Sequence, residues 1–153
     1  MRVLILLSFL SIPSGLFAQD RGSDERRLLH IHAEVIRAHV ERQVDLWMSL
    51  ESENYVSVNR GEVTFPGFSE RREQRSAYLQ GASFSTYRDL REPIVRISED
   101  GSLGWLIAEV EVVGTVPDQD NGRSSFHDIW AWIELYEKTD QDWRLIGNVS
   151  NRR

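Results

Sequence analysis

The sequence contains no cysteine, which excludes disulfide bonds, thiolate metal sites and a lipid-modified cysteine. Its 153 residues must therefore be held together by packing alone. Positive charge is also scarce, because 18 lysine and arginine residues face 24 aspartate and glutamate residues, for a formal net charge of −6. Without a basic cluster the chain lacks the charge on which phosphate contacts depend. We therefore expect no nucleic-acid partner.

Long hydrophobic runs are absent after residue 18, so no later segment is predicted to cross a membrane. Residues 1–18 have the features of a signal peptide: a positive start, an apolar stretch at residues 3–10, and Ala18 as the small residue before a cut at Gln19. An uncleaved membrane anchor is the alternative, which the short apolar run disfavours. The pattern predicts a periplasmic or secreted protein with no membrane association after cleavage.

The first half of the remaining chain reads mainly as helix. Ser23 is suited to cap a helix, and helical periodicity continues to about Leu50, with a bend expected at residues 41–43. A short hairpin is predicted within residues 55–65, followed by a polar helix over residues 70–80 that Ser69 would cap.

The second half reads as strand. Residues 86–98 predict one strand bulged at Pro93, and residues 103–116 predict a second. The hairpin within residues 126–149 sorts its side chains with a period of two. Its apolar face holds Ile129, Ala131, Ile133 and Leu135. Its mixed face holds Phe126, Asp128, Trp130, Trp132, Glu134 and Tyr136.

Helices followed by a long antiparallel meander indicate a single α+β domain over residues 19–153, with a strongly curved sheet around the N-terminal helices. In this arrangement the chain resembles the nuclear-transport-factor-2-like (NTF2-like) superfamily, and within it the SnoaL-like bacterial members of mostly unassigned function. The resemblance is carried, in order, by VDLW at 44–47, ENYVSV at 53–58, SEDGSLGW at 98–105 and WRLI at 143–146. It implies a cone with a pocket between sheet and helices, and often a dimer.

The catalytic layouts of that superfamily do not transfer to this chain. Ketosteroid isomerases share the fold and use a carboxylate after the first strand, where this sequence has Asn59. The place of their phenol donor falls near Glu34. The histidines that many SnoaL-like chains carry on the last strand correspond to Gly147 and Val149.

The expected pocket defines a set of candidate ligand contacts. They are His39, Trp47, Tyr55, Asn59, Tyr87, Arg91 and His127. His39 and His127 are expected to meet in the cone, as a proton-transfer pair, as part of a metal site, or simply as hydrogen-bonded histidines at the edge of the core. The last interpretation is preferred because no third ligand accompanies them, so neither a metal nor a cofactor is expected.

The mixed face has two interpretations. Because an apolar face should pack on the helices, the mixed face would turn outward and serve as a homodimer interface of Glu109, Trp130, Trp132 and Glu134. Alternatively, its aromatic rings and carboxylates line the pocket.

Three functions remain open on the sequence alone. The first is an exported domain that binds a small apolar or mixed-polarity molecule. The second is a small cofactor-free enzyme that uses histidine acid–base chemistry on a hydrophobic metabolite. The third is a dimeric accessory domain with a vestigial pocket.

Overall fold

The structure is a computed structural model that describes residues 15–120, 122–140 and 142–153. It begins with helix α1 (Gly15–Val40), whose buried stripe of Leu28, Ile31, Val35 and Ala38 faces the sheet. The helix therefore starts well before Ser23, and the prediction of a cap there is wrong, because Ser23 lies inside the helix. Most of the predicted signal peptide lies outside the described residues. No helix among the described residues is long and apolar enough to span a membrane.

The bend predicted at residues 41–43 is confirmed. Arg42 adopts the left-handed backbone conformation, with φ 58°, and helix α2 (Val44–Leu50) begins immediately afterwards. Strands β1 (Glu51–Asn59) and β2 (Glu62–Thr64) form the predicted hairpin. Its turn places Gly61 at φ 82°, a conformation that glycine adopts without steric cost. Helix α3 (Phe68–Gly81) then begins after Gly67, so Ser69, which was predicted to cap it, lies inside the helix.

The segment predicted as one strand bulged at Pro93 forms two strands, β3 (Ser83–Asp89) and β4 (Ile94–Ile97). Both pair antiparallel with β5 (Leu103–Pro117). The Leu90 amide still donates to the Glu109 carbonyl at 2.8 Å, but Pro93 has no N–H to continue the ladder. The break at Pro93 therefore divides the segment into two strands that both pair with β5.

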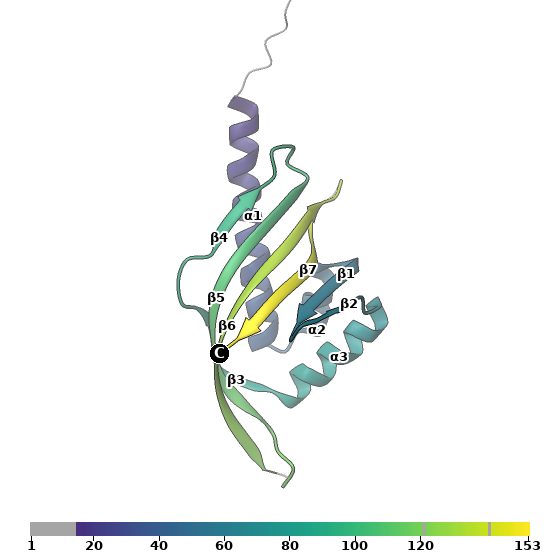
Figure 1. The fold of residues 1–153 in the computed structure, drawn as a ribbon, viewed down its shortest axis with the longest axis vertical. Helices are drawn as coiled ribbons and strands as arrows, with labels where there is room; N and C mark the ends of the chain where they lie inside the picture. The colour runs from purple at the N-terminus through teal and green to yellow at the C-terminus, as the bar shows by residue number, and fades with distance from the viewer. Residues whose placement is uncertain (1–14, 121, 141) are drawn as a thin grey trace, which may run out of the picture.

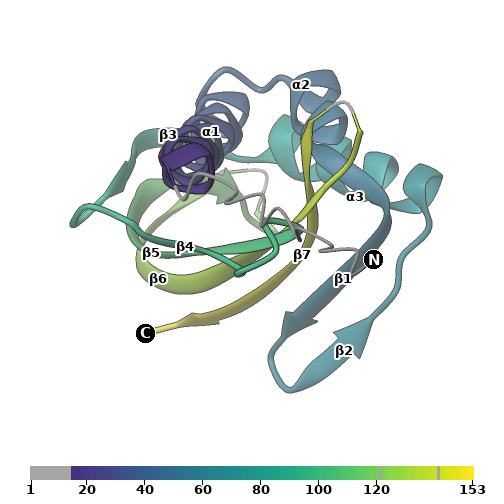
Figure 2. The same ribbon diagram turned by 90° about the horizontal axis from the view of Figure 1, so that it is seen from above.

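The remaining strands are β6 (Arg123–Lys138) and β7 (Trp143–Arg152), which form the predicted hairpin. The sheet order is β2-β1-β7-β6-β5-β3, with β4 also on β5. All described pairs are antiparallel except β1 with β7, which is parallel. Figures 1 and 2 show this sheet curving around α1, with the three helices on its concave side.

The register of β5 with β6 decides which side chains face the helices. Trp132 lies opposite Ala108, and Glu134 lies opposite Leu106, all on the concave face and all buried. Ile133, by contrast, is 36 % exposed. The prediction that the apolar face of this hairpin packs on the helices is therefore wrong. The mixed face turns inward, and the apolar face turns outward.

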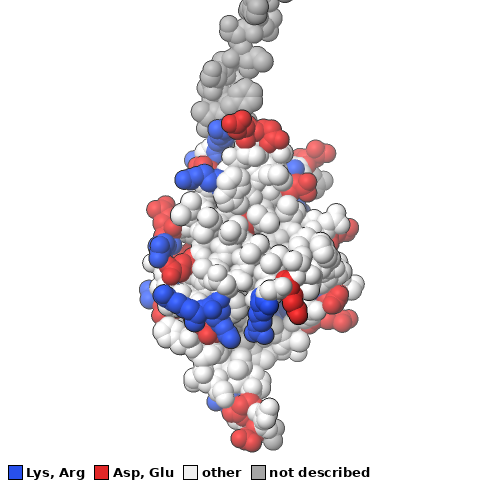
Figure 3. Space-filling model, viewed as in Figure 1, with Lys and Arg blue, Asp and Glu red and all other residues white. Residues whose placement is uncertain are grey.

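The convex side of the sheet carries an apolar surface, which we call the outer apolar face. It consists of Ile94, Trp105, Ile107, Ile133, Leu135 and Val149, each between 36 and 48 % exposed. Cross-strand pairing joins Ile94 to Ile107, Ile107 to Ile133, and Ile133 to Val149, so the surface is continuous over four strands. Figure 3 shows this side of the sheet with a broad uncharged centre and charged residues around it.

Candidate functional site

A cavity of about 550 Å³ lies between the concave side of the sheet and the helices. Side chains from all three helices and from β1, β3, β5, β6 and β7 form its wall. The aromatic lining residues are His39, Trp47, Tyr55, Tyr78, Tyr87, Phe126, Trp130 and Trp132. The charged lining residues are Arg60, Arg75, Asp128, Glu134 and Arg152. The cavity therefore combines flat aromatic walls with a few charged groups, as ligand pockets commonly do.

His39, on the last turn of α1, lies at the buried end of the cavity and is 5 % exposed. Its Nδ1–H donates to the Val35 carbonyl at 2.7 Å, so Nε2 keeps the free lone pair. The ring centroid lies 4.0 Å from that of Trp47 and 4.8 Å from that of Tyr87. Burial, with a smaller contribution from the Arg75 guanidinium, lowers the pKa of His39 to about 4. The imidazole is therefore neutral near pH 7.

A buried ionic network forms the inner wall. His32 Nδ1 lies 3.0 Å from both carboxylate oxygens of Glu134, and His32 Nε2 lies 3.0 Å from Asp89 Oδ1. Burial opposes protonation of His32, but the two carboxylates outweigh it and raise its pKa to about 10. Glu134 also accepts from Trp132 Nε1 at 3.1 Å and from the Tyr136 hydroxyl at 2.6 Å. This carboxylate is fully bonded, and it holds the Trp132 indole against the cavity.

Two tyrosines complete the buried end. Tyr55, on β1, is 7 % exposed, and Tyr87, on β3, is partly buried. Burial raises the pKa of both hydroxyls, so both remain protonated near pH 7. Neither hydroxyl makes a hydrogen bond to any described residue. Both groups are therefore available to a ligand as donors and acceptors.

Arg75 fixes the neighbouring part of the wall. Its guanidinium lies 4.4 Å from the Trp47 ring centroid and 5.3 Å from that of Tyr55, a cation–π arrangement. It also bonds to Glu51, a carboxylate that Arg71 approaches from the other side. These contacts hold α2, α3 and β1 together around the cavity.

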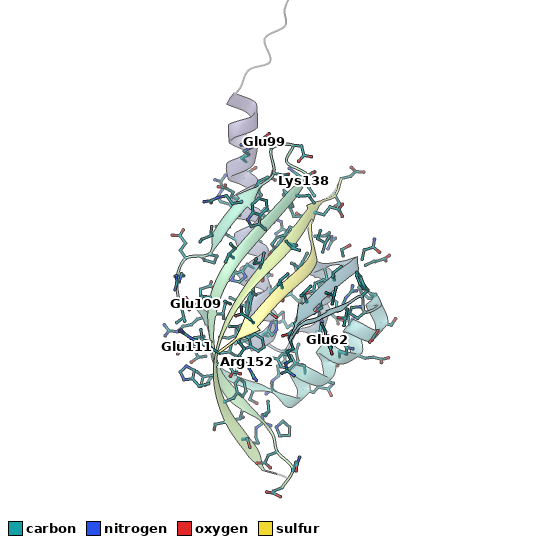
Figure 4. The ribbon with its side chains drawn as sticks, in the orientation of Figure 1. Glu62, Glu99, Glu109, Glu111, Lys138 and Arg152 are labelled. Carbon is teal, nitrogen blue, oxygen red and sulfur yellow. The ribbon has the colours of Figure 1, made fainter. Side chains whose placement is uncertain are left out.

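The open end carries Arg60, Asp128 and Arg152. Arg152 is 47 % exposed, pairs with Asp128 at 3.3 Å, and lies 5.7 Å from the Trp130 ring centroid. Arg60, in the β1–β2 turn, is exposed and forms no ion pair with any described residue. Figure 4 shows Arg152 near the end of β7. Two guanidinium groups and the carboxylate of Asp128 therefore line this mouth, and Glu62 lies beside Arg60 in an adjoining hollow.

Five of the seven predicted ligand contacts line the cavity: His39, Trp47, Tyr55, Asn59 and Tyr87. Arg91 and His127 do not. Arg91 is 71 % exposed and pairs with Glu109, while His127 is 60 % exposed and lies 3.0 Å from Glu111. The expected meeting of His39 with His127 is therefore wrong, because His127 shares the outward face of β6 with Ile129.

The predicted dimer residues are separated by the sheet. Trp130, Trp132 and Glu134 line the cavity on the concave side. Glu109 lies opposite Ala131 in the register, which places it on the other side with Glu111 (Figure 4). The four residues cannot form one interface, because a one-residue offset between neighbouring strands exchanges the faces. The second interpretation of the mixed face, a pocket wall, agrees with the structure.

Sequence reasoning missed the network of His32, Glu134 and Asp89. A signal existed, because His32 follows Ile31 within the apolar stripe of α1, four residues after Leu28. A buried position on a helix stripe requires a polar side chain to have a partner. Among the described residues, no group of three or more histidine, aspartate or glutamate side chains is placed to hold a metal ion.

Comparisons with known proteins identify the fold. No protein-family model matches the chain, and no curated protein matches it. Among solved structures, a protein of unknown function from Mycobacterium tuberculosis matches with TM-score 0.67 and 13 % identity, over 89 % of this chain and 75 % of that one. An NTF2-like protein from Cytophaga hutchinsonii matches with TM-score 0.66 and 12 % identity, over 82 % of this chain and 95 % of that one. A ketosteroid isomerase-like protein from Erwinia carotovora atroseptica matches with TM-score 0.67 and 11 % identity, over 84 % and 95 %.

Proposed function

We propose that this chain, which has the NTF2-like fold, is an exported protein that binds a small molecule in the cavity between its sheet and its helices. The observation that carries the proposal is the cavity itself, about 550 Å³ and lined by aromatic rings. Pockets for small organic ligands fall in the range of roughly 300–1,000 Å³. A vestigial pocket would be filled by its own side chains, and this one is open.

Binding is favoured over acid–base catalysis by the state of the histidines. His127 lies outside the cavity. His39 faces it, but the low pKa of about 4 leaves this imidazole neutral and a weak base near pH 7. Efficient general acids and bases have pKa values near the working pH. The cavity therefore supports recognition through a fixed acceptor better than proton transfer.

Filling the cavity should weaken ligand binding. N-phenyl-1-naphthylamine, a neutral fluorophore that brightens in dry apolar sites, should bind the wild-type protein. Ser57→Trp places an indole in the space that the ligand needs and should weaken binding by about 5- to 150-fold, the equivalent of the roughly 1–3 kcal/mol that overpacking costs. Ser125→Trp, at an exposed site on β6 outside the cavity, is the matched control and should bind like the wild type. Absence of binding to the wild type, or equal binding to both variants, would contradict the proposal.

Export is the part of the proposal that rests on residues 1–18. A positive start, an apolar stretch and Ala18 support cleavage before Gln19. The intact mass of protein recovered from the periplasm or medium should correspond to a chain that begins at Gln19. A mass that includes residue 1 would contradict cleavage.

We also propose a homodimer, now through the outer apolar face. Six exposed apolar side chains on a continuous sheet surface are characteristic of an interaction site. A two-fold dimer would place the same surface of each copy against the other. Ion pairs of Arg88 with Glu111 and of Arg91 with Glu109 border this surface, as expected for a polar rim.

A charge in the centre of this surface should separate the subunits. Ile133→Glu would bury an unpaired carboxylate in the interface, so sedimentation velocity should report a dimer for the wild type and a monomer for the variant. Gln80→Glu, at an exposed position of α3, is the control that should remain dimeric. A wild-type protein that is monomeric at tens of micromolar would disprove this interface.

A further inference from the structure

The buried end of the cavity holds polar atoms without protein partners. His39 Nε2 and the hydroxyls of Tyr55 and Tyr87 make no hydrogen bonds to described residues, although His39 and Tyr55 are 5 and 7 % exposed. No buried side-chain nitrogen or oxygen of the described residues is both unbonded and sealed from solvent. The unbonded atoms must therefore open onto the cavity.

These three atoms define what a ligand must present to them. His39 Nε2 can only accept, because Nδ1–H is already donated to Val35. The two tyrosine hydroxyls can donate or accept. A ligand hydroxyl is the complement, since it donates to the imidazole and accepts from a phenol. A purely apolar ligand would leave these groups desolvated and unpaired, which is costly.

The surroundings of Glu134 decide which end of the ligand lies at the buried end of the cavity. Its oxygens are already bonded to His32, Trp132 and Tyr136, so it offers no free acceptor. Its charge is compensated by His32, and the nearby Arg75 is already paired with Glu51, so this end has no unpaired positive group for an anion. A ligand that carries both a hydroxyl and an anionic group would therefore enter with the hydroxyl first.

The mouth supplies guanidinium groups that an anion can reach. Among the described residues Arg60 has no ion-pair partner, and Arg152 forms an ion pair only with Asp128, at 3.3 Å. Glu62 lies in the adjoining hollow with Arg60 but forms no ion pair with it. These two guanidinium groups lie together at the mouth of a chain whose net charge is −6, so they are a local feature and not a general property of the surface. Guanidinium groups of this kind bind carboxylates with two parallel hydrogen bonds.

Between the two ends the walls are flat. Trp130 and Trp132 lie on neighbouring inward positions of β6, and Phe126 follows on the same face. Large aromatic faces favour stacking with a planar ring. We propose that the ligand is a hydroxylated aromatic carboxylate, held with its hydroxyl at His39 and the tyrosines and its carboxylate at Arg152 and Arg60. This inference rests on the proposed small-molecule-binding function and names its ligand class.

The test uses three matched probes measured by isothermal titration calorimetry. They are 6-hydroxy-2-naphthoate, 2-naphthoate without the hydroxyl, and 2-naphthol without the carboxylate. The first should bind about tenfold tighter than either of the others, because a charge-assisted or a neutral hydrogen bond is lost in each case. If 2-naphthol binds as tightly as 6-hydroxy-2-naphthoate, the anionic end of the proposal is wrong. If 2-naphthoate does so, the hydroxyl end is wrong.

Variants assign each end to its residues. Arg152→Gln should remove the advantage over 2-naphthol, and His39→Phe or Tyr55→Phe should reduce the advantage over 2-naphthoate. Arg72→Gln, an exposed arginine outside the cavity, is the control that should leave these preferences unchanged. Binding of N-phenyl-1-naphthylamine by each variant verifies an intact cavity. If that neutral probe binds but 6-hydroxy-2-naphthoate binds no tighter than the other two naphthalenes, the proposed ligand class is wrong and the proposed small-molecule binding is still supported. If the neutral probe also fails with the wild type, both fall.

Discussion

Replacing Arg71 with methionine should lower the free energy of unfolding by about 3–5 kcal/mol, the typical effect of removing one partner from a buried ion pair. The side chain of Arg71 is completely buried. Its Nε donates to Glu51 at 3.1 Å. Its two terminal nitrogens donate to three backbone carbonyls, those of Glu53, Pro66 and Ser52, at 3.2, 2.7 and 2.6 Å. Methionine fills similar space but leaves the three carbonyls and one side of the Glu51 carboxylate without a donor.

Arg72 provides the matched control for this effect. It is the next residue of α3 and pairs with Asp45 at 2.5 Å, but both side chains are largely exposed. Arg72→Met should change the free energy of unfolding by less than about 1 kcal/mol. Chemical denaturation in urea measures both variants. Equal losses for Arg71→Met and Arg72→Met would show that the buried guanidinium does not join α3 to β1. The double variant Arg71→Met with Glu51→Met should lose less than the sum of its single changes, because each single change already breaks the Arg71–Glu51 ion pair, although Arg75 also loses its partner.

Glu134→Leu should be similarly destabilising, by about 3–5 kcal/mol. The change leaves the charged His32 with Asp89 alone and removes the acceptor of Trp132 Nε1 and of the Tyr136 hydroxyl. Glu137→Leu, at an exposed position of the same strand, should have little effect. Combining Glu134→Leu with His32→Leu should recover part of the loss, because the buried imidazolium that has lost one of its two carboxylates is then gone. A double variant as unstable as the sum of both singles would show that the two groups are not coupled.

The same network predicts a pH dependence of stability. The pKa of His32 rises from 6.5 to about 10 on folding, so the folded state binds the additional proton. The contribution of His32 to the free energy of unfolding is therefore fully present below about pH 6.5 and is lost as the pH rises towards 10. Urea midpoints of the wild type should fall over this interval. The variant that lacks both His32 and Glu134 should not show this component of the slope.

The order of helices and strands could be predicted from the sequence, because long segments with a clear hydrophobic period indicate their secondary structure. The bend at residues 41–43 and the pairing of β6 with β7 were predicted correctly. The facing of β6 was not, because its two faces were judged by polarity alone. The inward face carries Glu134, and its charge is compensated by His32 from α1, more than one hundred residues earlier in the chain. A period of two defines the two faces of a strand but does not reveal partners supplied by another element.

The candidate site was accessible only in part, for a related reason. Residues placed in the cone from the helices, β1 and β3, such as His39, Tyr55 and Tyr87, do line the cavity. Because the faces of β6 were predicted the wrong way round, His127 was expected inside the cavity and Trp132 outside it. In the structure His127 is exposed and Trp132 is buried. Arg152 could not be assigned to the mouth from sequence, because its position follows from the register of β7 against Trp130.

The parallel pairing of β1 with β7 has a consequence for the order of assembly during translation. The ribosome delivers β1 early and β7 last among the strands, yet the register joins Val56 to Gly147 and Asn59 to Ser150. A nascent chain complete through β6 already has both tryptophans of the inner wall but lacks the strand that connects them to β1. The cavity wall is therefore completed late, when β7 pairs with β1. Pairing between strands so far apart in the chain is slow, because the long segment between them must be ordered first.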